Sequence, residues 1–269
     1  MMEEVRVHFD GSFDAVAYSA RPRPVDGSYM PVFLAGEGFA RSMASALQVP
    51  VKSFSHQEGH IEAIKAYSPW SHEEEFLACH FSGGTCEVLQ VRTLPKGQAV
   101  YGINQIGGSK DISFGQVLDR MGVQLGYDFP AGEAMDQAAL SATDSTQLLT
   151  PIKVKDAQLN LSGIDTQIKN LLEKNGENIA SGQFDVNGLI REFFEKMTKA
   201  MAKMLVQAAE RSGKDKILMA GGVASSRFLQ VHLQDQLKKS GLKLFFDANG
   251  LSQDNAVGIA LLGGGCLWD

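Results

Sequence analysis

The sequence has few cysteines: three among 269 residues, at positions 79, 86 and 266, with no Cys-x-x-Cys pair. Three cysteines cannot form the framework of disulfide pairs that is typical of small secreted proteins. A reducing, cytoplasmic setting is therefore the simpler interpretation. No stretch of about 20 residues is continuously apolar, which argues against a membrane span. The acidic start, Met1-Met2-Glu3-Glu4, lacks the basic and then apolar pattern of a secretory signal.

Positive charge is also scarce. The 25 Lys and Arg residues are outnumbered by 31 Asp and Glu, which gives a net charge of −6. No general basic surface therefore indicates nucleic-acid binding, although a local basic patch stays open. Neither a Ser-His-Asp nor a Cys-His arrangement stands out, so we assign no catalytic nucleophile. The rest of the composition, 44% hydrophobic and 21% charged, is typical of a globular protein with one large domain or two lobes.

Short apolar runs alternate with longer amphipathic stretches, which is the pattern of an α/β fold. The longest predicted helix carries a Met-rich apolar face, which we interpret as core. A polar stretch from Ser68 to Glu75 is a candidate lobe boundary. Strands are predicted over residues 15–18, 76–80, 87–91, 216–220 and 244–246, and helices over residues 33–47, 113–125, 133–139, 187–211, 224–239 and 254–262. A further helix is predicted to begin within residues 54–60 and to run through Ala66.

His56 and His60 stand four residues apart near the start of a predicted helix. Imidazoles at this spacing share one helix face and can bind one metal ion, with a carboxylate from elsewhere completing the site. The alternative is two partly exposed histidines that line a helix start. Asp254 is the candidate carboxylate, and it could equally cap the last helix. The pattern is not the zinc-protease signature, because Gln57 follows His56.

Two glycine loops could approach a phosphate. The first, Ser82-Gly83-Gly84-Thr85, lies between predicted strands and is either an anion-binding loop or an ordinary hairpin turn. The second, Gly221-Gly222-Val223, separates a strand from a helix, where exposed amides and the helix dipole favour an anion. Its alternative is tight strand–helix packing. Asp119 could receive a ribose hydroxyl or be solvated, and Gly132 could approach a ligand or simply turn the chain.

The order of these motifs resembles one family. That family comprises the bacterial and archaeal tRNA threonylcarbamoyl transferases (TsaD/Gcp-like), formerly described as O-sialoglycoprotein endopeptidases. The resemblance spans nearly the whole chain. Similar segments are Asp14-Ala15-Val16-Ala17-Tyr18, Ser55 to His60, Phe81 to Thr85, Leu161-Ser162-Gly163-Ile164, Met219 to Ala224 and Gln253 to Ala256.

The resemblance implies an α/β, actin-like ATPase (ASKHA) fold of two lobes. Residues 1–75 would be the remnant of a truncated N-terminal lobe, 76–253 the C-terminal lobe, and 254–269 a final helix returning to the cleft. One divalent metal ion, iron or zinc, would be held by His56, His60 and Asp254. An ATP-derived adenylate would be bound by Phe81, Ser82, Gly83, Gly84, Thr85, Asp119, Gly132, Gly221, Gly222 and Ser226.

The implied reaction transfers a threonylcarbamoyl group from threonylcarbamoyl-AMP to N6 of an anticodon-loop adenosine. Companion subunits would bring the tRNA, and the N-terminal lobe could pair in a homodimer or heterodimer. Two departures favour an alternative, a catalytically impaired nucleotide-binding paralogue that regulates or pairs with a full-length relative. The family's Gly-Ile-Glu-Thr-Ser-type phosphate loop is absent, and Ser226 replaces an asparagine. A metallopeptidase is disfavoured because the sequence has no His-Glu-x-x-His.

Overall fold

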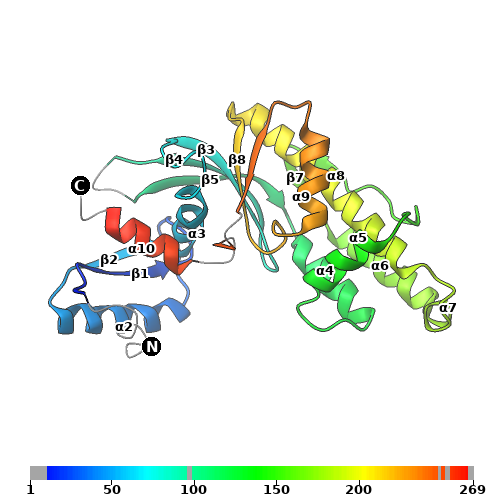
Figure 1. The fold of residues 1–269 in the computed structure, drawn as a ribbon, viewed down its shortest axis with the longest axis horizontal. Coiled ribbons are helices and arrows are strands. Elements are labelled where there is room, and N and C mark those ends of the chain that lie inside the picture. Colours follow the sequence, from blue (N-terminus) through cyan, green and yellow to red (C-terminus); the bar gives the residue numbers. More distant parts are fainter. Residues whose placement is uncertain (1–10, 96–98, 248–249, 252–254, 266–269) are drawn as a thin grey trace. The chain divides into compact units, whose positions relative to one another are not determined.

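The computed structural model describes residues 11–95, 99–247, 250–251 and 255–265 and forms two compact units (Figure 1). Unit 1 comprises Met1–Ala66, Leu94–Tyr101 and Asp254–Asp269, and unit 2 comprises Tyr67–Thr93 and Gly102–Gln253. Within the described ranges, no helix is long and apolar enough to cross a membrane.

Unit 1 is a small α/β layer structure. Strand β1 (Val16–Arg21) runs parallel to β2 (Val51–Ser55) in a two-stranded sheet. Helix α2 (Val32–Leu47) covers one face of this sheet, and α10 (Ala256–Gly265) covers the other (Figure 1). Helix α3 (His56–Lys65) follows β2 directly and packs against α10. The unit therefore brings the His-bearing helix and the last helix together.

Unit 2 is built on a seven-stranded sheet with strand order β6-β7-β5-β4-β3-β8-β9. Strands β3 and β4 form an antiparallel hairpin, and β8 runs parallel to both β3 and β9. The strands are β3 (Glu75–Phe81), β4 (Cys86–Thr93), β5 (Tyr101–Ser109), β6 (Val154–Lys155), β7 (Gln158–Leu159), β8 (Lys216–Ala220) and β9 (Lys243–Phe246). Its helices are α4 (Phe114–Gln124), α5 (Gly132–Ser141), α6 (Ser162–Lys174), α7 (Gly176–Ala180), α8 (Val186–Ser212) and α9 (Arg227–Leu237).

The core of unit 2 forms around α8. The Met-rich face predicted from the sequence is buried, as expected for core packing. An N-cap from Asp185 starts this helix and Gly213, with a φ of 69°, ends it, so local signals and packing agree on its limits. The fully buried members of the face are Leu189, Ile190, Phe193, Phe194, Met197, Met201, Met204, Leu205 and Ala208.

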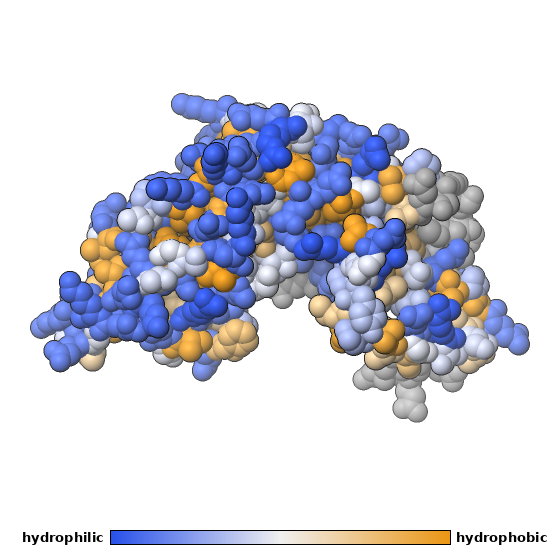
Figure 2. Space-filling model, turned by 180° about the vertical axis from the view of Figure 1, so that it is seen from behind, coloured by the Kyte–Doolittle hydropathy of each residue, from blue (hydrophilic) through white to orange (hydrophobic). Residues whose placement is uncertain are grey.

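On the face shown in Figure 2, hydrophilic residues predominate and apolar residues form small separate patches. Several exposed apolar side chains belong to α2 and the segment before it in unit 1, namely Tyr29, Met30, Val32, Leu34 and Phe39.

Candidate functional site

The His-x-x-x-His motif begins where β2 ends. Ser55 caps α3 in a reciprocal box: its hydroxyl accepts from the Glu58 amide at 3.2 Å, and the Glu58 carboxylate accepts from the Ser55 amide at 2.7 Å. This cap places His56 in the first turn and His60 one turn later on the same face. Their Nε2 atoms lie 3.1 Å apart. The structure thus brings the two predicted ligands together.

Helix α10 approaches α3 unusually closely. A Cβ on Gly258 would lie 1.8 Å from the carbonyl oxygen of Gly59, so only glycine fits at this crossing. The approach allows the Asn255 side-chain amide to donate to the His56 carbonyl oxygen at 2.6 Å. Ser19 on β1 donates to the same amide group at 2.8 Å. The start of α10 is therefore fixed beside His56.

The two imidazoles fit a metal site. Two nitrogens that are each about 2.0–2.1 Å from one ion lie roughly 2.9–3.4 Å apart, depending on the coordination geometry. The observed 3.1 Å falls within that range and is also the length of a hydrogen bond between the two rings, which pairs them when no metal is bound. Burial lowers the pKa of His56 below its ordinary value, which favours the neutral imidazole that binds metals. Asp254 lies outside the described residues, and those described contain no cluster of three or more metal-ligating side chains.

Unit 1 also contains a cavity of about 550 Å³ between β1 and α10. Its polar lining includes Ser19 and Asn255, which join it to the hydrogen bonds around His56. Most of the other lining residues are small. These residues include Ala15, Ala17, Ala256, Ala260, Gly263 and Gly264.

In unit 2 the Phe81–Thr85 loop is the turn of the predicted β3–β4 hairpin. Its ends are closed by a bond from the Ser82 amide to the Thr85 carbonyl oxygen at 2.8 Å. The Ser113 hydroxyl at the start of α4 donates to the Gly83 carbonyl oxygen at 2.6 Å. Gly115 permits this contact, because a Cβ there would lie 2.5 Å from the Ser82 carbonyl oxygen. Positions 83 and 84 face open space.

The second glycine loop packs against the first. Gly221 has a φ of +93°, and a Cβ there would lie 2.4 Å from the Phe81 carbonyl oxygen. The Val223 amide donates to that same oxygen at 2.9 Å. Both the anion-loop and the packing interpretations of Gly221-Gly222 therefore have a physical basis, and packing alone already requires glycine at position 221.

Helix α9 begins at Arg227, three residues later than the sequence predicted, because a series of hydrogen-bonded turns occupies residues 221–226. Ser226 is its N-cap. Asp136, buried on α5, accepts from the Ser226 hydroxyl and from the amides of Arg227 and Phe228 at 3.0 and 3.2 Å. An internal carboxylate thus binds the helix start at which the sequence predicted a ligand anion.

Asp119 and Gly132 meet at the start of α5. The Asp119 carboxylate accepts from the Ala131 amide at 2.9 Å, so it holds the turn that precedes the helix. Gly132 is the first residue of α5, with open space where a Cβ would be. The structure therefore places these two predicted ligand residues close together in the chain fold, with Asp119 already bonded to backbone.

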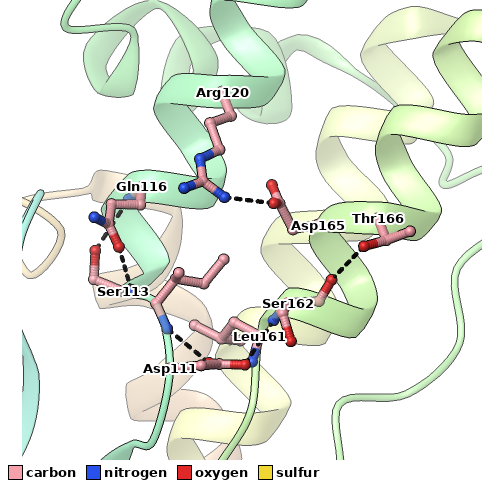
Figure 3. Close-up of polar contacts among 9 residues, drawn as sticks. Asp111, Ser113, Gln116, Arg120, Leu161, Ser162, Asp165 and Thr166 are labelled. Carbon is pink, nitrogen blue, oxygen red and sulfur yellow. Dashed lines mark hydrogen bonds and ion pairs between the residues drawn. The ribbon is translucent and has the colours of Figure 1, made fainter.

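The Leu161–Ile164 segment, similar to a family motif, is a helix start held by an aspartate. Asp111 accepts from the amides of Ile112, Leu161 and Ser162 at 2.7–3.0 Å, and so ties the start of α4 to the start of α6 (Figure 3). Partial burial alone would raise the pKa of Asp111, but these amide bonds outweigh it and hold that pKa well below its ordinary value.

The sequence as a whole matches a described protein family. The family model described as TsaD, tRNA N6-adenosine threonylcarbamoyltransferase, matches residues 1–261. The chain belongs to the TsaD family. A family member from Thermus thermophilus is 31% identical over 229 residues, which cover 85% of this chain and 64% of that protein. A second family member, from Neorickettsia sennetsu, is 28% identical over 259 residues, which cover 95% of this chain and 74% of that protein.

The solved structures that match confirm the fold class. Full-length HypF, in a phosphate- and nucleotide-bound form, superposes with a TM-score of 0.61 at 13% identity over 97% of this chain and 41% of that one. HypF from T. kodakarensis gives a TM-score of 0.55 at 14% identity over 84% of this chain and 39% of its own. The TsaD-family chain therefore has the α/β, actin-like (ASKHA) fold that the resemblance implied.

Sequence reasoning missed three residues of these candidate sites. Asn255 fixes the start of α10 at His56, Glu58 closes the α3 cap, and Asp136 binds the start of α9. Only Glu58 had a local signal, since Ser55-x-x-Glu58 is the capping-box pattern. The other two act across more than 90 positions of the chain, a distance at which one sequence gives no pairing information.

Proposed function

We propose that this chain transfers a threonylcarbamoyl group to N6 of adenosine in tRNA, with one divalent metal ion as cofactor. Membership of the TsaD family and the activity for which its relatives are named support the reaction. The 3.1 Å separation of the His56 and His60 Nε2 atoms is the observation that carries the metal site. The chain spans 64% of the length of the Thermus relative.

His56 and His60 would hold the ion, with Asp254 as the proposed third ligand next to Asn255. Iron or zinc would polarise the donor group and orient it for attack. In the reaction, the N6 amine forms a C–N bond to the carbamoyl carbon, the bond to the AMP phosphate oxygen breaks, and the amine proton passes to solvent. This chain's own residues bind and orient: no covalent enzyme intermediate is required, in agreement with the lack of an assigned nucleophile.

In unit 2 we propose that the open side of the Gly83–Gly84 turn contacts the adenylate, helped by Thr85 and by Gly132 at the α5 start. The remaining proposed ligand residues are Phe81, Ser82, Asp119, Gly221, Gly222 and Ser226. A net charge of −6 supports contact with tRNA through companion subunits. The exposed apolar residues of α2 support pairing of unit 1 with another chain. A cytoplasmic location completes the proposal.

The test combines metal analysis with an activity assay. We expect about one equivalent of iron or zinc in the purified protein and its loss in His56→Ala and His60→Ala, with exposed His72→Ala as the matched control. Unmodified tRNA, threonylcarbamoyl-AMP and the companion proteins should yield modified adenosine with the wild type and with His72→Ala only. Full activity of His56→Ala would contradict the metal role.

A second candidate function, an impaired nucleotide-binding paralogue, is favoured by the bond between Asp136 and Ser226. With this hydroxyl and the first α9 amides already satisfied, the helix start has less capacity for a phosphate. This alternative predicts measurable binding of AMP by calorimetry without product in the assay above. Product formation by this chain, with its companions but without a longer relative, would exclude it.

A further inference from the structure

Glu58 makes more contacts than its role as a capping residue requires. Its side chain is 1% exposed and both carboxylate oxygens accept hydrogen bonds. Oε2 accepts from the Ser55 amide and hydroxyl, each at 2.7 Å. Oε1 accepts from the backbone amides of Val100 and Tyr101 at 3.1 and 3.4 Å. One carboxylate thus joins the first turn of α3 to a chain segment more than 40 positions away.

The chain provides an internal reference for this arrangement. Helix α4 begins with the same box, Ser113 and Gln116, in which the Gln116 side-chain oxygen accepts from the Ser113 amide at 3.0 Å. A glutamine is therefore sufficient to close a cap of this kind. It has a single acceptor oxygen, so it could not also receive Val100 and Tyr101. The additional function of Glu58 must lie in its second oxygen.

The Val100–Tyr101 segment is itself held on α3. The Tyr101 hydroxyl donates to the Glu62 carboxylate, and the Lys65 ammonium lies 5.3 Å from the centre of the Tyr101 ring. Tyr101 is 2% exposed, so this segment packs closely along one side of the helix. On another side, α10 contacts α3 at Gly59. Helix α3 is therefore fixed from two directions, and Glu58 lies between His56 and His60 in the sequence.

From these contacts we infer that Glu58 is a positioning residue for the His56–His60 pair. It sets the first turn of α3 against the Val100–Tyr101 segment and thereby keeps the two Nε2 atoms at the separation that one metal ion requires. The inference rests on the proposed metal site for its consequence, although the positioning itself concerns only residues of this chain. A group that orients metal ligands typically changes metal affinity by about 10- to 100-fold when it is removed.

Three variants separate positioning from charge. Glu58→Gln keeps one acceptor oxygen and can close the cap. It lacks the second acceptor oxygen that binds the amides of Val100 and Tyr101. Glu58→Asp keeps the charge but is one methylene shorter, so it cannot reach both Ser55 and Val100. Glu62→Gln is the matched control: it removes a negative charge from the same helix, while its side-chain oxygen can still accept from the Tyr101 hydroxyl and keep the Val100–Tyr101 segment in place.

Co²⁺ is the probe, with its dissociation constant measured on the full chain by chelator competition and its geometry followed by visible absorption. We expect Glu58→Gln and Glu58→Asp to bind Co²⁺ about tenfold more weakly, at the lower end of the range for such partners. Glu62→Gln should stay within about twofold of the wild type. Equal affinity of all four proteins, or an equal loss in Glu62→Gln, would overturn the inference.

A measurement without metal decides the inference independently. The imidazole ¹⁵N signals of His56 and His60 in the metal-free protein should shift in Glu58→Gln and stay in place in Glu62→Gln, with far-UV circular dichroism confirming that both variants are folded. Should the wild type fail to bind Co²⁺, the metal part of the proposed function is overturned. Unchanged imidazole signals in a folded Glu58→Gln protein would instead overturn the positioning role.

Discussion

The longest helix of each unit shows how differently the two units are stabilised. Helix α8 of unit 2 buries 15 of its 27 residues, among them the Met-rich face. Helix α2 of unit 1 has 16 residues and buries only Ala40 and Ala44. Because burial of apolar surface is the main stabilising term in folding, unit 2 depends on a large distributed core, whereas unit 1 combines a smaller core, which includes Ile61, Ile64 and Ile259, with a few close contacts.

Several of these close contacts of unit 1 lie around α3. Gly59 and Gly258 allow two helices to touch backbone to backbone, and Asn255 and Glu58 then fix the helix by hydrogen bonds. A region stabilised in this way should tolerate substitutions at most surface positions but lose stability when one of these contacts is removed. Single substitutions should therefore distinguish the two units.

The largest effect is expected in the core of unit 2. Phe193 is fully buried on α8, and Phe193→Ala removes a large side chain that neighbouring groups cannot replace. The free energy of unfolding should fall by about 3–5 kcal/mol. Denaturant titration followed by circular dichroism measures this loss. The matched unit 1 change is Leu34→Ala on α2, where the side chain is 54% exposed, and it should have almost no effect. An equal loss from Leu34→Ala would show that a second chain covers α2.

The next effect tests the close contact within unit 1. In Gly258→Ala the new methyl group meets the Gly59 carbonyl oxygen and the Ala63 amide, which are backbone atoms that no rotamer change can move. We expect a loss of about 1–3 kcal/mol, seen as faster proteolysis within unit 1 than within unit 2. Gly264→Ala, on the same helix but facing open space, is the control and should be neutral or slightly stabilising. Equal behaviour of the two variants would contradict the crossing.

Elements with a strong period could be predicted from the sequence. The apolar spacing predicted helix α8, and two neighbouring apolar runs predicted the β3–β4 hairpin with its Ser82–Thr85 turn. The structure confirms both predictions. Strand β5 was missed because its buried positions follow no alternation and Gly107 and Gly108 interrupt the run. Those glycines are required by the tertiary structure: a Cβ at either would meet backbone of another segment, which no local pattern reveals.

The candidate sites show the same difference between residues on one element and residues far apart in the sequence. The spacing of His56 and His60 predicted a shared helix face, because both residues lie on one element. The binding of α9 by Asp136 was not predictable, since the carboxylate and the amides it receives are about 90 positions apart. For the same reason the sequence assigned Ser226 and Gly222 to a ligand without showing that a side chain of this protein already occupies the helix start.

A third prediction concerns pH and the aspartate that joins α4 and α6. Because the folded-state pKa of Asp111 is lowered, its contribution to stability is fully present above the unfolded pKa of about 3.9 and is lost progressively as the pH falls from there through the much lower folded-state pKa. Asp111→Asn should therefore destabilise unit 2 by about 1 kcal/mol at pH 7, a value limited by solvent exposure, and by progressively less at each step in pH below about 3.9. Urea titrations at pH 7 and at a series of lower pH values measure this, with exposed Asp128→Asn as the control. A loss that does not change with pH would contradict the role of the charge.

The smallest effect comes from a surface ion pair in each unit. Arg120 and Asp165 link α4 to α6 at 2.6 Å with side chains 55% and 22% exposed (Figure 3), whereas Arg41 and Glu37 lie on α2 alone. A double-mutant cycle should give a coupling free energy of about 0.5 kcal/mol for the first pair, decreasing in 1 M salt. The α2 pair should give a smaller coupling, because both of its side chains belong to one helix and Arg41 is 59% exposed, although both also interact with Tyr18 of β1. If the α2 pair coupled as strongly as the α4–α6 pair, unit 1 would have to be covered on that face, and the contrast between the two units would apply only to the isolated chain.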